Sequence, residues 1–108
     1  MFKVFRGILD KRFCYRLRAD NTELILSWEG YATKENCLEG IEIVRRCALE
    51  PENFKRIDAS FNYSFFLLKG VNGEIIGKSE NYLTPSAREA GIITVLRQAS
   101  EASLKDFS

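Results

Sequence analysis

Apolar side chains recur along this chain with two different periods. Residues 12–18 alternate polar and apolar side chains, which is typical of a half-buried strand. A partner strand follows a turn at Asn21-Thr22, and Asn72-Gly73 indicates a second hairpin turn. The period then becomes helical at Cys37, Gly40, Ile41, Val44 and Ala48, and again at Ala87, Gly91, Ile92, Val95 and Ala99. The pattern therefore predicts two units, each with strands followed by a helix.

The two units are copies of one sequence. Shifted by 51 residues, positions 16–48 match their counterparts at twelve places, where average residue usage gives roughly two. The matches are Leu17/Leu68, Asn21/Asn72, Glu23/Glu74, Ile25/Ile76, Glu29/Glu80, Tyr31/Tyr82, Thr33/Thr84, Gly40/Gly91, Ile41/Ile92, Val44/Val95, Arg46/Arg97 and Ala48/Ala99. A tandem repeat of this kind predicts one shared architecture in which each copy supplies a half.

The turns predict how the strands of each hairpin pair. If both are two-residue loops, Leu17 faces Leu26, Tyr15 faces Trp28 and Ala19 faces Leu24. One face of the sheet, the inner face, then carries Phe13, Tyr15, Leu17, Leu24, Leu26 and Trp28. The opposite, outer face carries Cys14, Arg16, Arg18, Ile25, Ser27 and Glu29. A slip of one residue would exchange the two faces.

Further sequence signals indicate where the helices begin and which structure the C-terminal residues adopt. Thr33 and Thr84 occupy matching N-cap positions, and the mid-helix Gly40 and Gly91 indicate close approach of helix and sheet. One motif of apolar, Lys, any, apolar occurs three times, at 2–5, 54–57 and 104–107. The third copy has no hairpin after it, so it should be an ordered strand added to a shared sheet.

These elements predict an α+β fold. Two tandem β-β-β-α repeats form one antiparallel sheet with two helices on one face and a swapped C-terminal strand. The chain is a single domain, residues 1–108, with repeats of about 1–51 and 52–108.

Two segments resemble the YegP-like family of small bacterial proteins. They are Ile25-Leu26-Ser27-Trp28-Glu29-Gly30-Tyr31 with Thr33 and Gly40-Ile41, and the run from Asn72 to Tyr82. The resemblance implies tandem three-strand-plus-helix units that form a single sheet with exchanged terminal strands. It implies no catalytic residue, because the family has no established biochemical function. The chain departs from the family pattern at Asn21-Thr22, at Trp28 and at Cys37 and Cys47.

The amino-acid composition limits the kinds of functional site that the chain can form. The chain has no histidine, which removes the commonest general base and excludes Ser-His-Asp and Cys-His arrangements. Three cysteines without a Cys-x-x-Cys motif favour reduced thiols in the cytoplasm. No signal core or membrane span is visible, and the net charge is +1. We expect no enzyme activity, no cofactor, no metal site and no membrane partner.

Two clusters remain as candidate binding residues. A basic group within residues 3–18 can bind phosphates, or it can simply be a solvated face that keeps the sheet soluble. It consists of Lys3, Arg6, Lys11, Arg12, Arg16 and Arg18, of which Arg16, Arg18, Arg12 and Lys11 are the candidate binding residues. Phe13 and Tyr15 should point inward and cannot stack on bases. The matched sets Glu29/Tyr31 and Glu80/Tyr82 are explained by structural roles at the strand-to-helix junction, and a pair of carboxylate–phenol sites is the alternative.

The outer face of the second copy differs from that of the first. Cys14 and Arg16 correspond to Phe65 and Leu67, so Phe65, Leu67 and Ile76 should form an exposed apolar patch. The favoured function is a non-catalytic protein-interaction module, a homodimer formed through this sheet face. The alternative is a nucleic-acid or anion binder that uses the basic outer face around Arg16 and Arg18.

Overall fold

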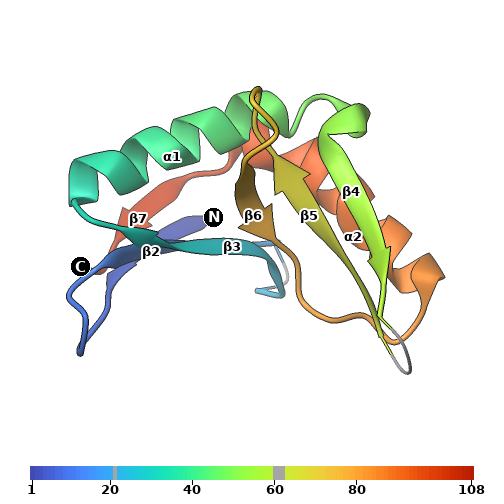
Figure 1. Cartoon of the computed structure of the whole chain (residues 1–108), viewed down its shortest axis with the longest axis horizontal. Helices are drawn as coiled ribbons and strands as arrows, with labels where there is room; N and C mark the ends of the chain where they lie inside the picture. Colours follow the sequence, from blue (N-terminus) through green and yellow to red (C-terminus); the bar gives the residue numbers. More distant parts are fainter. Residues whose placement is uncertain (21, 60–62) are drawn as a thin grey trace.

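The computed structural model describes residues 1–20, 22–59 and 63–108, and within them seven strands and two α-helices (Figure 1). The strands are β1 (Phe2–Arg6), β2 (Phe13–Arg18), β3 (Leu24–Tyr31), β4 (Phe54–Asp58), β5 (Ser64–Lys69), β6 (Ile75–Lys78) and β7 (Leu104–Asp106). The helices are α1 (Lys34–Cys47) and α2 (Pro85–Gln98), each followed by a short 3₁₀ turn, η1 (Pro51–Asn53) and η2 (Ala99–Glu101).

All of these strands belong to one sheet in the order β4-β5-β6-β3-β2-β1-β7. The C-terminal strand crosses from the second repeat to the first, where Lys105 pairs with Lys3. Pairing continues beyond the strand, because the Phe107 amide donates to the Val4 carbonyl at 2.8 Å. The predicted α+β fold of tandem repeats with an added terminal strand is confirmed. The sheet is mixed, however, because β7 runs parallel to β1 while the other pairs are antiparallel.

Both hairpins have a loop that is one residue longer than the sequence pattern predicts. The Ala19 amide donates to Glu23 and the Gly70 amide to Glu74, so the loops hold three residues instead of two. Asn21 lies outside the described residues, and Thr22 and Gly73 both have positive φ, 68° and 80°. A bulge after each loop then restores the register, so that Leu17 pairs with Leu26 and Tyr15 with Trp28, as predicted.

The same bulges correct part of the predicted outer face. Leu24 pairs with Arg18, not with Ala19, and the extra residue in each bulge is Ile25 or Ile76. Both isoleucines turn into the core, where they are 2% and 8% exposed. The predictions that Ile25 and Ile76 lie on the outer face, and that Leu24 lies on the inner face opposite Ala19, are therefore wrong, because three-residue loops demand an added residue on the returning strand.

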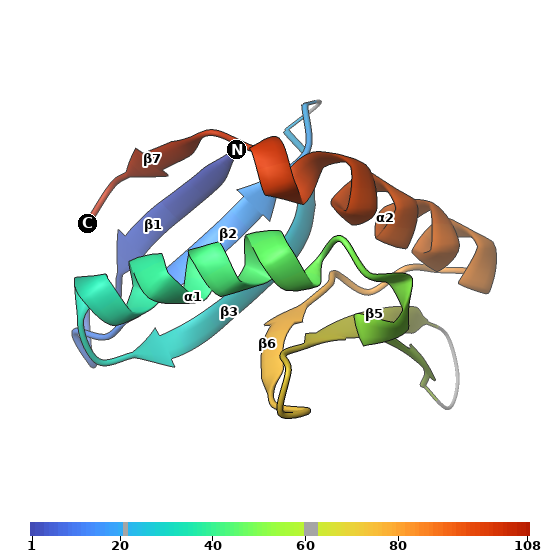
Figure 2. The same ribbon diagram turned by 90° about the horizontal axis from the view of Figure 1, so that it is seen from above.

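The helices cover the inner face of the sheet and enclose one core. Thr33 and Thr84 cap them as predicted, accepting hydrogen bonds from Asn36 and Ala87 at 3.1 and 3.0 Å. Figure 2 shows α1 lying across β2 and β3, and α2 on the same side of the sheet. Fully buried side chains from both repeats fill the space between the layers, among them Tyr15, Leu26, Ile41 and Phe66. The opposite face of the sheet has no helix over it.

The two repeats meet where β3 runs beside β6. Their register pairing there is the single pair Ser27 and Lys78. The buried Tyr15 hydroxyl reinforces it by donating to the Ile76 carbonyl at 2.5 Å. Gly77 leaves room for that phenol, since a Cβ at Gly77 would lie 2.7 Å from the hydroxyl oxygen. The counterpart of Tyr15 in the second repeat is Phe66, so this link has no symmetric equivalent.

Candidate nucleic-acid interface on the outer sheet face

The predicted basic residues lie in two places. Arg16 stands exposed near the middle of the outer face, and Arg18 follows on the same strand, where it donates to the Thr22 carbonyl at 3.1 Å. Arg12 instead donates to the Gly30 carbonyl at 3.0 Å, at the far end of β2. Lys11 lies in the loop before it with a φ of 58°. The fold thus keeps Arg16 and Arg18 together and separates them from Lys11 and Arg12.

The strand register places further cations beside Arg16. Following partners across the sheet from β4 to β7 gives one row of directly paired residues on the outer face. The row reads Lys55, Leu67, Lys78, Ser27, Arg16, Lys3 and Lys105. We call these seven residues the basic row. It crosses the whole sheet, a width of about 29 Å at the usual spacing between strands.

Three of these cations, Lys55, Lys78 and Lys105, were missed from the sequence. Lys55 and Lys105 belong, with Lys3, to the motif that occurs three times, and Lys78 is the counterpart of Ser27. The lysine shared by the three motifs was the signal that could have found Lys55 and Lys105. It pointed to a common face only once the non-local pairings of β1 with β7 and of β3 with β6 were known.

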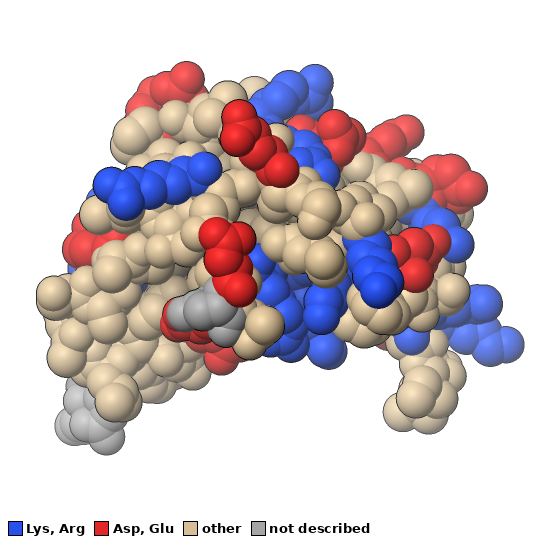
Figure 3. Space-filling model, turned by 180° about the vertical axis from the view of Figure 1, so that it is seen from behind, with Lys and Arg blue, Asp and Glu red and all other residues tan. Residues whose placement is uncertain are grey.

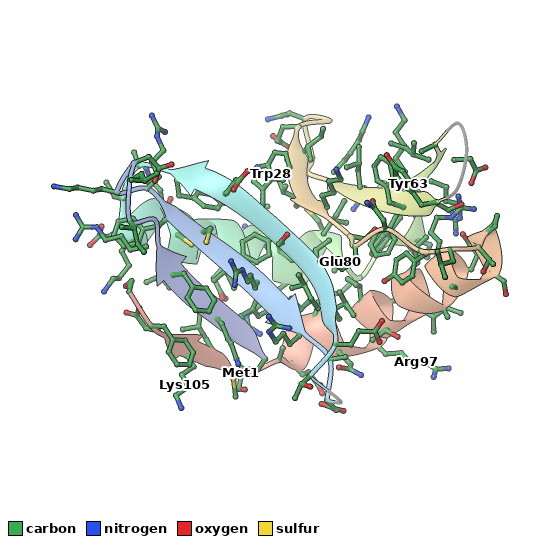
Figure 4. All side chains as sticks on the ribbon, turned by 90° about the horizontal axis from the view of Figure 1, so that it is seen from below. Met1, Trp28, Tyr63, Glu80, Arg97 and Lys105 are labelled. Atoms are coloured by element: carbon green, nitrogen blue, oxygen red, sulfur yellow. The ribbon has the colours of Figure 1, made fainter. Side chains whose placement is uncertain are left out.

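Aromatic rings lie between these cations. Phe5 and Phe107 stack with centroids 5.4 Å apart and planes 10° apart. The Arg16 guanidinium lies 4.7 Å from the Phe5 centroid, and Lys3 and Lys105 lie 5.5 and 5.4 Å from that of Phe107. Figure 4 looks onto this face with the helices behind the sheet, and Lys105 lies toward one end of it.

The predicted apolar patch is smaller than expected. Phe65 and Leu67 are half-buried on the outer face, but Ile76 is buried in the core. Lys78 covers Phe65 at 4.8 Å from its centroid, and Tyr63 stacks beside the same ring at 6.2 Å. What remains is a short aromatic and aliphatic stretch at the β5 end of the sheet, where Figure 4 labels Tyr63.

Charge is segregated between the two sides of the sheet. Among the described strand residues, the outer face carries the cations Lys3, Arg16, Arg18, Lys55, Lys69, Lys78 and Lys105, against the acidic Glu29. Acidic strand residues turn toward the helices instead, where Asp106 pairs with Lys34 at 2.9 Å and Asp58 with Arg88 at 2.6 Å. Figure 3 shows one group of Lys and Arg atoms at the lower middle of the molecule, with other Lys and Arg atoms lying among acidic ones elsewhere in this view. The net charge of +1 therefore conceals a strongly basic face.

The thiols and phenols show no sign of activation. Burial raises the pKa of the Cys14 thiol even though Arg16 opposes the shift, and burial raises the pKa of Cys37 to about 11. Burial also raises the pKa of Tyr31 to about 12. Tyr31 and Tyr82 pack against the mid-helix Gly40 and Gly91, where a Cβ would lie 2.5 and 2.3 Å from the phenol oxygens. These two tyrosines thus serve the contact between helix and sheet.

Two further findings limit the chemistry of the described residues. No group of three or more His, Cys, Asp or Glu side chains among residues 1–20, 22–59 and 63–108 is placed to hold a metal ion. In the same part of the chain, neither helix has the length and apolar character needed to cross a bilayer.

Fold and surface together define a tandem-repeat α+β protein with an open, basic sheet face. Comparison with known proteins gives the family. A protein-family model described as "Domain of unknown function (DUF1508)" matches residues 10–54 and 62–106. The chain therefore belongs to the UPF0339/YegP family. UPF0339 protein PA0329 of Pseudomonas aeruginosa is 37% identical over 92% of this chain and 90% of its own length. UPF0339 protein YegP of Escherichia coli is 36% identical over 90% and 88%.

Solved relatives have the same fold. The solution structure of UPF0339 protein SO3888 from Shewanella oneidensis matches with a TM-score of 0.90 at 30% identity, over 97% of this chain and 88% of that one. The solution structure of the Escherichia coli protein yegP, described as of unknown function, also gives 0.90, at 34% identity over 98% and 90%. The family resemblance stated from the two sequence motifs is confirmed.

Proposed function

We propose that this protein binds single-stranded nucleic acid on the outer face of its sheet, without catalysing a reaction on it. The observation that carries the proposal is the basic row, in which five cations from five strands are aligned by backbone pairing across the sheet. Rigid strands hold these charges in a line, which suits a phosphate backbone better than charges scattered over loops.

The aromatic side chains favour a single strand over a duplex. Unpaired bases stack on exposed rings, and stacking needs no particular base. Phe107 is 48% exposed and already stacks on Phe5 beside three cations, so a base can continue the stack while its phosphates meet Lys3 and Lys105. Tyr63, 42% exposed, offers a second ring near the other end of the row.

The absence of catalysis is part of the proposal. The sequence holds no histidine, and burial raises the pKa of each of the three thiols. Free cysteines also suit the reducing cytoplasm, where we place this function.

The test is binding of fluorescently labelled single-stranded RNA and DNA of about twelve nucleotides, within the usual site sizes, followed by anisotropy at several salt concentrations. We expect Arg16→Glu and Lys78→Glu each to weaken binding about tenfold and to lower the slope of log K against log salt by about 0.7 per lost phosphate contact. Arg46→Glu on α1 makes the same charge change away from the outer face and should leave binding unaltered. Equal losses in all three variants, or no salt-dependent binding by the unaltered protein, would exclude the proposal.

A second candidate, self-association, is favoured by Tyr63, Phe65 and Leu67 at the β5 end of the sheet. Sedimentation equilibrium should then show a homodimer that Phe65→Glu or Leu67→Glu dissociates. Ile93→Glu, which alters an exposed apolar residue on α2, should leave the dimer intact. A monomer at every concentration rules out this candidate. It is the weaker one, because a face-to-face dimer would bring Lys55 and Lys78 of both copies into one interface, where like charges repel.

A further inference from the structure

The outer face is hollowed where the two repeats meet. Strands β3 and β6 are paired at Ser27 and Lys78, and the two strands diverge on either side of this pair. A hollow of about 330 Å³ lies there on the outer face. Its lining includes Arg16, Ser27, Trp28, Glu29 and Lys78, so three members of the basic row border it. A volume of this size is at the lower end of the range for small-ligand sites.

Glu29 is the unexpected residue in this lining. It is the one acidic side chain on the outer face among the described strand residues, and it lines the hollow together with Arg16 and Lys78. A carboxylate repels phosphates, so it weakens a surface that binds only a nucleic-acid backbone. A carboxylate is useful, however, where a base presents N–H donors, because base edges are read by hydrogen bonds.

Guanine fits this combination better than the other bases. Its Watson–Crick edge presents two neighbouring donors, N1–H and the N2 amino group, which match the two oxygens of one carboxylate. The O6 acceptor beside them requires a donor, and the Ser27 hydroxyl lines the hollow and can supply one. Arg16 and Lys78 also line the hollow, with their charged groups over the rings of Phe5 and Phe65 on either side. Adenine, cytosine and uracil each present a single donor position on that edge, so they can use only part of the site.

The second repeat has different residues at the positions that line this hollow. The counterpart of Trp28 is Ser79, whose hydroxyl accepts from the Phe66 amide at 2.9 Å and donates to the Glu80 carbonyl at 2.8 Å. The counterpart of Arg16 is Leu67, so the second repeat has an aliphatic residue where the first has an arginine. One repeat thus keeps a polar hollow at the junction, and the other uses the same positions for packing.

We infer that the hollow at the β3–β6 junction binds one guanine base of a single strand, with Glu29 accepting from N1–H and N2–H. This inference rests on the proposed function, since the basic row holds the strand that delivers the base. The chain therefore binds single strands through the row and selects guanine at one position.

The experiment compares uridine oligonucleotides of about eight residues that carry one central guanine, inosine, adenine, cytosine or uracil. Anisotropy measures the affinity for each oligonucleotide. We expect the guanine oligonucleotide to bind about fivefold or more tightly than the uridine one. Inosine, which lacks the N2 amino group, should lie between them.

Variants of the protein then distinguish the selection of guanine from the binding of the strand as a whole. Glu29→Gln replaces one acceptor by a donor and should abolish the guanine preference while leaving the salt slope unchanged. Glu80→Gln, the matched change in the second repeat, should retain both. Salt-dependent binding without a guanine preference, or a preference that survives Glu29→Gln, overturns the inference and leaves the proposed function standing. Absence of binding by every oligonucleotide overturns both, and guanosine monophosphate binding as tightly as the oligonucleotide overturns the role of the strand.

Discussion

At the scale of single residues, the repeat is best explained by the contact between a tyrosine and a helical glycine. A Cβ at Gly91 would lie 2.3 Å from the Tyr82 hydroxyl and 2.7 Å from Cζ, and Gly40 meets Tyr31 in the same way. Alanine normally stabilises a helix by about 1 kcal/mol relative to glycine. Here the ring must move, and overpacking of this kind costs about 1–3 kcal/mol. The duplicated glycines therefore serve the close approach predicted from the sequence.

We accordingly expect Gly91→Ala and Gly40→Ala to lower the free energy of unfolding by about 1 kcal/mol or more, measured by urea denaturation. Tyr82→Phe alone should cost little, because the buried Tyr82 hydroxyl finds no hydrogen-bond partner among the described residues. Tyr82→Phe should also recover part of the loss in Gly91→Ala by removing the closest atom. A gain of stability in Gly91→Ala would show that the contact imposes no strain.

At the scale of elements, the sequence predicted what depends on local signals. The caps at Thr33 and Thr84, both helical stripes and the pairing of Leu17 with Leu26 are present as expected. The errors are at Leu24, Ile25 and Ile76, because an Asn-Gly-type pair suits both two- and three-residue loops. Either loop length gives the same strand pairing farther from the turn, because the bulge adds one residue to the returning strand when the loop has three residues.

The candidate site was harder to predict for a related reason. Arg16 and Arg18 could be placed on one face from a single hairpin, since their register depends on a nearby turn. The alignment of Lys55, Lys78 and Lys105 with Arg16 depends on pairings between segments far apart in the chain. Alternation within one strand sets the face of each side chain, but neighbours across the sheet follow only from strand order. The hollow around Glu29 follows from the same junction.

At the scale of the whole molecule, the last strand closes the fold by returning the second repeat to the first. Arg45 of α1 holds the segment before β7, donating to the carbonyls of Ala102 at 2.7 Å, Ser100 at 3.2 Å and Ala99 at 3.4 Å. Its guanidinium also lies 4.9 Å from the Phe2 centroid, so it contacts β1, to which β7 adds. A cation is favourable at this place, where the carbonyls at the end of α2 carry partial negative charge.

The position of β7 matters for binding, because this strand supplies Lys105 to the basic row and is followed by Phe107. We expect Arg45→Ala to raise amide hydrogen exchange in residues 102–108 about tenfold, as loss of a charge-assisted hydrogen bond of about 1.5 kcal/mol implies. Exchange in β5 and β6 should not change, and Arg46→Ala, its exposed neighbour, is the control. The same Arg45 variant should bind single strands more weakly although no residue of the face is altered. Unchanged protection of the Phe107 amide would mean that pairing with β1 holds the strand without Arg45.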